Sequence, residues 1–248
     1  YAVVATDYTG LGTRFRNAFS DMQSNATDVI NSIPAARAAV PELSRKWVAL
    51  GTSEGGMAVA ALAESENEIR DPNYLGATAI SGVFEPQNVY ESLAKGSFND
   101  VLAFLAYGIK TVYPQFEVSH MLTEKALPLY NHISQDCSND APEPELSATQ
   151  MLIPDWQSDK YVKQYFARNT LGEKPAYGPL LIIASQSNPA HPTTTTQVVA
   201  RMCKQGDRIQ FEQYQNPDSG GLIGTSVSAQ IAWLRGRFAA GPAPTNCH

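Results

Sequence analysis

Ser53 has a glycine two residues before it and another two residues after it, in the run Gly51-Thr52-Ser53-Glu54-Gly55. Small residues at these two places let a strand turn sharply into a helix, which leaves the serine hydroxyl exposed at the helix N-terminus. There the hydroxyl can attack a carbonyl carbon, while the amide of Glu54 and the helix dipole stabilise the oxyanion that forms. The pattern therefore predicts a serine nucleophile for acyl transfer. The alternative is a glycine-rich helix start with a serine cap.

The residues around Ser53 fit a strand, a turn and a helix. Trp47 to Leu50 is an apolar run, and the alanine-rich stretch from Gly55 to Ser65 is typical of a helix. Further strands are expected at Ala2 to Thr6, Leu75 to Ile80, Pro179 to Ala184 and Arg208 to Tyr214, and further helices at about Asp21 to Ala39, Thr194 to Gln205 and Thr225 to Phe238. This alternation predicts an α/β fold with a mostly parallel sheet covered by helices.

The middle of the chain follows another pattern. Between Glu85 and Gly178 no buried strand is expected, and amphipathic stretches at Phe98 to Tyr107 and Asp159 to Arg168 are separated by prolines. We interpret residues 85–178 as a helical cap inserted into a core made of residues 1–84 and 179–248. The alternative is a helical decoration unrelated to the active site.

Composition excludes several classes of protein. A chain of 248 residues is expected to form one domain with an elaboration, and nothing in it calls for a cofactor or a metal. The net charge is −6 and the 18 basic residues are scattered, which argues against a nucleic-acid surface. No apolar run approaches the ~20 residues of a transmembrane helix. The chain starts within a strand-like pattern that no turn precedes, which indicates either a mature fragment or a sequence that starts late.

From Tyr1 to Cys247 the sequence resembles the secretory lipase family of α/β-hydrolases, which includes the fungal lipase A type and related bacterial secreted esterases. The stretches that carry this resemblance are residues 1–12, 51–55, 179–184 and 242–247. It implies an α/β-hydrolase fold with a helical cap, a secreted protein, and an ester or lipid as the substrate.

The resemblance also assigns the other two members of a catalytic triad. The family has its catalytic aspartate in a loop after the late apolar strand, and Asn188 stands at that place. The family's catalytic histidine follows an aspartate near the C-terminus, and Ser219, after Asp218, stands there. An asparagine lacks the negative charge that favours the imidazolium, and a serine cannot act as a base near neutral pH. The acid and base positions are therefore both replaced.

His191 is the candidate substitute for the missing base. It lies three residues beyond Asn188 on the same loop, and the alternative role is that of a surface residue. His120 and His132 fall in the predicted cap, where their spacing gives no support for a catalytic role, and His248 is terminal.

The resemblance gives roles to two further groups of residues. It places Asp7, in an Asp-Tyr-x-Gly segment, at the oxyanion hole together with Glu54, although without the family Asp7 is equally a turn-forming aspartate. It also implies a disulfide between Cys203 and Cys247. In the family, a segment upstream of the part that matches Tyr1 carries the first strands of the sheet and a cysteine that would pair with Cys137; the alternative is a minimal version of the fold with an odd thiol.

Together these features predict a secreted carboxylic ester hydrolase, a lipase or esterase, that works through an acyl-enzyme on Ser53. The main alternative is a catalytically inactive protein of the same fold that binds an apolar ligand or a partner protein beneath the cap. A third possibility is a non-hydrolytic enzyme that uses the same pocket and oxyanion donors.

Overall fold

The computed structural model describes residues 1–95, 100–135, 146–186, 192–215 and 219–247. They form two compact units. The sheet unit comprises Tyr1–Thr6, Met22–Glu85 and Thr170–His248, and the helical unit comprises Asp7–Asp21 and Pro86–Asn169. The roles of core and cap given to these parts of the chain stay predictions.

The sheet unit is built on four strands: β1 (Trp47–Thr52), β2 (Tyr74–Ile80), β3 (Leu180–Ser185) and β4 (Ile209–Tyr214). They lie in the order β1-β2-β3-β4 and every pair is parallel. Parallel neighbours need crossover connections, and here helices supply them. The predicted α/β class with a parallel sheet flanked by helices is confirmed.

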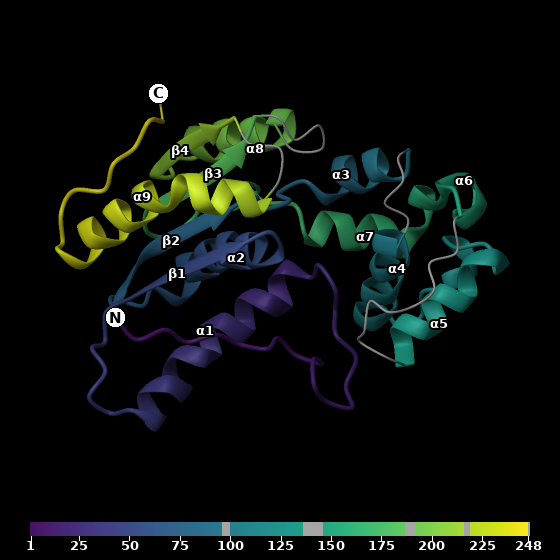
Figure 1. Cartoon of the computed structure of the whole chain (residues 1–248), viewed down its shortest axis with the longest axis horizontal. Coiled ribbons are helices and arrows are strands. Elements are labelled where there is room, and N and C mark those ends of the chain that lie inside the picture. The colour runs from purple at the N-terminus through teal and green to yellow at the C-terminus, as the bar shows by residue number, and fades with distance from the viewer. Residues whose placement is uncertain (96–99, 136–145, 187–191, 216–218, 248) are drawn as a thin grey trace. The chain divides into compact units, whose positions relative to one another are not determined.

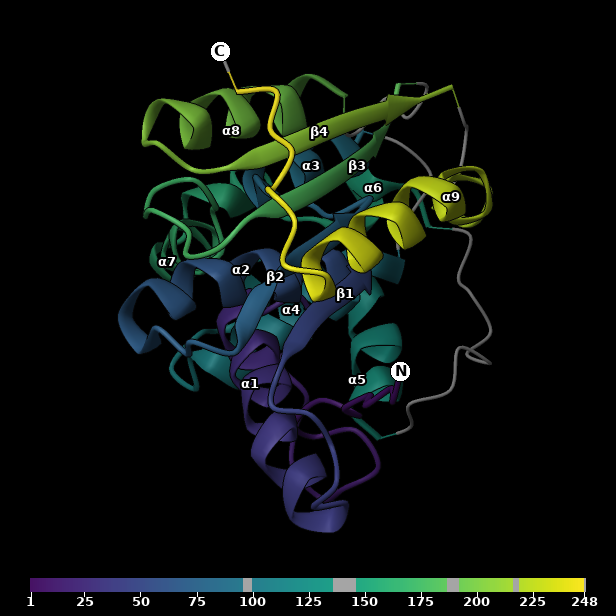
Figure 2. The same cartoon turned by 90° about the vertical axis from the view of Figure 1, so that its left-hand side faces the viewer.

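Helices cover both faces of this sheet (Figures 1 and 2). On one face, α1 (Met22–Ala39), α2 (Glu54–Ile69) and α8 (Pro192–Lys204) pack in a core that includes strand residues such as Ala77 and Ile182. On the other face, α9 (Ser219–Phe238) packs through Leu222 and Trp233 on Ile80, Leu181 and Ile183. Strand residues alternate between the two cores, as the pleat requires.

The strand predicted at Ala2 to Thr6 is wrong. These residues form no strand, and Val3 is 90% exposed. An apolar run becomes a strand only where a neighbouring strand accepts and donates its backbone hydrogen bonds, and none of the described strands pairs with this segment. The Tyr1 ring instead lies 4.9 Å from the ring of Phe238.

The last helix begins earlier than predicted, at Ser219 rather than at Thr225. Glycines at 220, 221 and 224 made this start look unfavourable for a helix. Leu222 lies within the glycine run and is fully buried against the sheet. Burial of that side chain offsets the low helix propensity of its neighbours.

The helical unit contains α3 (Pro86–Leu93), α4 (Asp100–Val112), α5 (Leu127–Gln135), α6 (Ala148–Met151) and α7 (Lys160–Arg168), with short 3₁₀ turns between several of them. Asp159 caps α7, because its carboxylate accepts from the amides of Tyr161 and Val162 at 2.7 and 3.2 Å. Pro128 does not break α5 but lies in its first turn, where a proline is tolerated. The fully buried Asp21 pairs with Arg168 at 2.7 Å.

None of the helices among the described residues is both long and apolar enough to cross a membrane.

Glu64 is a buried acid on α2, and it makes stability depend on pH. It is 6% exposed, and its Oε1 accepts from the amide of Gly172 at 2.7 Å. Burial raises the pKa of Glu64 from 4.5 to about 7, although the Gly172 amide opposes this rise. Because the folded pKa exceeds the unfolded one, the contribution of Glu64 is full below about pH 4.5 and is lost as the pH rises to about 7.

We therefore expect Glu64→Gln, which is neutral at every pH, to be more stable than the natural chain at pH 8, by about 3 kcal/mol. Near pH 4.5 the two proteins are expected to be equally stable. Urea unfolding at a series of pH values measures the difference. Glu68→Gln, at an exposed position of the same helix, is the matched control. The prediction would be contradicted if the free energies of unfolding of Glu64→Gln and of the natural chain changed with pH in the same way.

Candidate active site

Ser53 lies at the junction of β1 and α2, in the conformation that a nucleophile elbow requires. Its backbone has φ 53° and ψ −117°, a positive φ that a residue with a side chain rarely adopts. The Ser53 amide donates to the Ile80 carbonyl at 2.9 Å, which ties the turn to the end of β2. The side chain is exposed. A strained backbone of this kind is kept only where surrounding structure holds it.

The glycines around Ser53 are required by close backbone contacts. A Cβ atom on Gly51 would lie 2.1 Å from the carbonyl oxygen of Gly55, so the strand and the helix could not meet at this angle with larger residues. A Cβ atom on Gly56 would lie 2.7 Å from the Ile80 carbonyl oxygen, so this glycine lets α2 approach β2. The sequence thus folds into the turn because its small residues occupy the positions of closest approach.

The residue after Ser53 has its side chain engaged elsewhere. The Glu54 carboxylate accepts from Nδ2 of Asn25 at 2.9 Å, and Asn25, on α1, is only 1% exposed. The carboxylate at this position therefore has a polar partner on a neighbouring helix. Sequence analysis missed Asn25, because the two residues are 29 positions apart and no local pattern links them.

The carboxyl ends of all four strands lie at the edge of the sheet that carries Ser53, since every strand pair is parallel. β2 ends at Ile80, and the next residue, Ser81, has a positive φ of 51° like Ser53. β3 and β4 stay paired to their ends, where the amide of Gln186 donates to the Tyr214 carbonyl at 2.8 Å. The loops that follow β3 and β4 therefore begin side by side at this edge.

The loop after β3 contains the predicted acid position, and the loop after β4 leads into the predicted base position. Asn188 and His191, after β3, lie outside the described residues, as does Asp218 after β4. Ser219 is the first residue of α9. The strand order brings the chain segments to one edge of the sheet, and the catalytic roles of the side chains stay predictions.

The remaining candidate residues, Asp7 and the histidines, lie in other parts of the chain. Asp7 is exposed and belongs to the helical unit. In the same unit, Nδ1 of His120 lies 3.0 Å from a carboxylate oxygen of Asp159, and Nε2 of His132 is buried without a partner among the described residues. His248 lies outside the described residues.

Glu85 and the potential metal-binding side chains add nothing to this site. Glu85, which follows β2, pairs with Nη1 of Arg201 at 2.9 Å, so it forms an ion pair within the sheet unit. Within the described ranges, no group of three or more His, Cys, Asp or Glu side chains could hold a metal ion.

The implied disulfide is present. Cys203, near the end of α8, is bonded to Cys247 in the C-terminal tail, and the two Cα atoms are 5.3 Å apart. Asn246 adds to this anchor, because its amide donates to the Ile209 carbonyl at 3.0 Å and its side chain exchanges hydrogen bonds with Phe211. The tail is therefore fixed along β4. Cys137 lies outside the described residues.

Comparisons with known proteins agree with this architecture. A family model described as secretory lipase matches residues 1–246. No curated protein matches the chain. The structure is similar to the cell-wall-degrading esterase LipA from Xanthomonas oryzae, with a TM-score of 0.75 and 18% identity over 92% of this chain and 69% of that one. It is also similar to Candida antarctica lipase A, with a TM-score of 0.76 and 16% identity over 93% of this chain and 57% of that one.

At these identities the two structures establish a shared fold and no more. The chain spans little more than half the length of the Candida protein.

Proposed function

The chain belongs to the secretory lipase family, and from this premise we propose that it is a carboxylic ester hydrolase in which Ser53 is the nucleophile. The observation that carries the proposal is the backbone of Ser53, which has a positive φ in a turn closed by Gly51 and Gly55. A strained serine at the carboxyl edge of a parallel sheet, with a helix starting behind it, is the arrangement that nucleophile elbows use. The substrate proposed is an ester or a lipid.

The proposed reaction has two stages. The Ser53 hydroxyl attacks the ester carbonyl carbon, its proton passes to a base, and the carbonyl oxygen takes up the negative charge. The amide of Glu54 and the dipole of the helix that begins there stabilise this oxyanion. Collapse of the intermediate breaks the ester C–O bond, and the base returns the proton to the departing alcohol. Water then attacks the acyl-enzyme by the same steps and releases the carboxylic acid.

The base in this proposal is His191. Ser219, at the family's histidine position, cannot accept a proton near neutral pH, because its own hydroxyl is far too weak an acid and its oxygen far too weak a base. An imidazole has an ordinary pKa near 6.5 and suits the task. His191 belongs to the segment after β3, the strand whose carboxyl end shares an edge with Ser53. Asn188, three residues earlier, could orient the imidazole as an acceptor but supplies no charge.

Secretion fits the proposal. The family is named for secretion. The bond between Cys203 and Cys247 is of a kind that persists in oxidising compartments and is rare in a reducing cytosol.

The second candidate function is ligand binding without turnover, and the replacements at Asn188 and Ser219 favour it. In that case the fold would keep an apolar binding site while the proton relay is lost. It predicts saturable binding of a fluorescent fatty acid and no covalent chemistry at Ser53.

A fluorophosphonate probe distinguishes the two functions, because it reacts only with an activated serine. We expect labelling of the natural chain that disappears in Ser53→Ala and falls steeply in His191→Ala. Ser81→Ala is the matched control, since Ser81 directly follows the next strand, β2, and has a similar positive φ; this variant is expected to keep its labelling. A folded natural chain that is not labelled, and that binds the fatty acid with an affinity lowered by Ser53→Trp, would establish the second function instead, because the substitution ties the binding to this site.

A further inference from the structure

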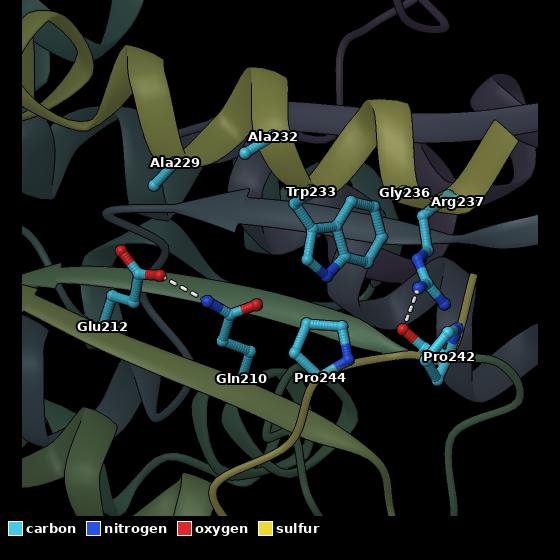
Figure 3. A pocket seen from close by; sticks show the side chains of 9 residues that line it. All are labelled: Gln210, Glu212, Ala229, Ala232, Trp233, Gly236, Arg237, Pro242 and Pro244. Atoms are coloured by element: carbon cyan, nitrogen blue, oxygen red, sulfur yellow. Dashed lines mark hydrogen bonds between the residues drawn. The ribbon is translucent and has the colours of Figure 1, made fainter. Parts of the chain in front are cut away.

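A cavity of about 310 Å³ that is partly open to solvent lies between α9, β4 and the C-terminal tail, all within the sheet unit (Figure 3). On the α9 side its wall consists of the small residues Ala229, Ala232 and Gly236, and on the tail side of Pro242 and Pro244. Small residues on the helix allow close approach, and proline rings supply apolar surface. This wall suits a short aliphatic chain.

Two buried side chains of α9 bring nitrogen atoms to the same cavity. Figure 3 shows Trp233 and Arg237 pointing from the helix toward the tail. They are 4% and 7% exposed. Nη2 of Arg237 donates to the carbonyls of Gly241 and Pro242 at 3.0 and 2.7 Å. Nε of Arg237 and Nε1 of Trp233, however, have no acceptor among the described residues. Two buried donors without acceptors are unfavourable, and they mark a place for an oxygen ligand.

The positive charge of Arg237 is balanced only weakly, by a cation–π contact in which its guanidinium carbon lies 5.6 Å from the centre of the Trp233 ring. No described carboxylate forms an ion pair with it. Glu212 lines the cavity on the β4 side, but its two oxygens accept from the side-chain amide of Gln210 and from the hydroxyl of Tyr214. Burial lowers the pKa of Arg237, and the nearby charge of Arg208 lowers it further. An anion beside the guanidinium would relieve both effects.

We propose that this cavity binds a small monocarboxylate with a short aliphatic tail. The carboxylate lies against Arg237 and Trp233, where it supplies the missing acceptors and the missing charge, and the tail lies along the wall of α9 and the two prolines. A planar guanidinium matches a carboxylate in shape and forms strong, charge-assisted hydrogen bonds with it. This site is separate from Ser53, and the inference does not depend on the proposed hydrolase activity.

Titration of the full chain with octanoate tests the proposal by calorimetry, together with NMR of the Trp233 indole N–H, assigned with Trp233→Phe. We expect saturable binding, a shift of the Trp233 resonance, and an affinity reduced about tenfold or more in Arg237→Gln. Arg235→Gln is the matched control, because Arg235 is exposed on the same helix, and its affinity is expected to be unchanged. Octanol, which has the tail without the charge, and acetate, which has the charge without the tail, are each expected to bind about tenfold more weakly than octanoate.

Several results would overturn the inference: no saturable binding, equal binding of octanol, an unshifted Trp233 resonance, or unchanged affinity in Arg237→Gln. Displacement of octanoate by inorganic phosphate at equal concentration would show a general anion site and also contradict the proposed ligand class. If Arg237→Gln does not fold, Arg237→Lys takes its place. That variant keeps the charge but loses the planar fork, so weaker octanoate binding is expected, and unchanged binding would contradict the proposal.

Discussion

Replacing Asn188 by aspartate and Ser219 by histidine in the same chain is expected to raise the rate of ester hydrolysis by about 10³-fold or more. A histidine at 219 would take the Ser53 proton, a role worth about 10² to 10⁴ in rate. An aspartate at 188 would orient the imidazole and stabilise its charged form, and loss of that charge costs about 10⁴ in a well-studied serine protease. The strand order supports an interaction between the two new side chains, because positions 188 and 219 follow the neighbouring strands β3 and β4, in which Ser185 lies opposite Tyr214.

Hydrolysis of 4-nitrophenyl butyrate measures this effect. Each single variant is expected to gain much less than the pair, since members of a triad act as a unit. In the double variant the rate is expected to rise with pH around 6.5, as the new imidazole loses its proton. Adding Ser53→Ala to the double variant is expected to remove the gain.

A folded double variant no faster than the natural chain would show that positions 188 and 219 are not the acid and base positions. It would leave the test of Ser53 by the fluorophosphonate probe untouched.

The turn at Ser53 was predictable because it is encoded locally. Gly51 and Gly55 stand where the backbone comes closest to itself, and an apolar run and an alanine-rich run flank them. The same holds for β3, whose buried residues form a short continuous apolar run. Such patterns specify the element whatever surrounds it.

The sequence-based predictions were wrong or incomplete where the local structure depends on contacts with distant parts of the chain. Ala2 to Thr6 has a strand-like pattern, but no described strand lies beside it to complete the hydrogen bonds. The first turns of α9 depend on burial of Leu222 rather than on local propensity. The bond between Asn25 and Glu54 joins two helices, and the cavity at Arg237 exists only because the tail returns to β4. None of these features has a signature in a short stretch of sequence.

The disulfide between Cys203 and Cys247 holds the C-terminal tail against β4. Removing this disulfide is expected to lower the free energy of unfolding by a large amount. The bond closes a loop of 44 residues, which restricts the unfolded chain and contributes about 4 kcal/mol by chain entropy. Cys203 and Cys247 also pack against the core of the sheet unit, where serine would be less well accommodated. We therefore expect Cys203→Ser, Cys247→Ser and the double variant each to lower the free energy of unfolding by about 4 kcal/mol.

The three variants are expected to lose the same amount of free energy of unfolding, because each of them breaks the same single bond. This equality is what distinguishes the disulfide from other causes. Energies of independent sites would add, whereas here the second substitution is expected to cost little beyond the first. Urea unfolding of the oxidised proteins measures the losses, and reductant should bring the natural chain close to the variants. A double variant that loses nearly twice as much as either single variant would assign the effect to packing of the two side chains rather than to the bond. Pro242 and Pro244 line the cavity and belong to the tail that this disulfide anchors. Octanoate binding at Arg237 is therefore expected to weaken in the same three variants. The redox state of the Cys203–Cys247 bond would then control whether the cavity is intact.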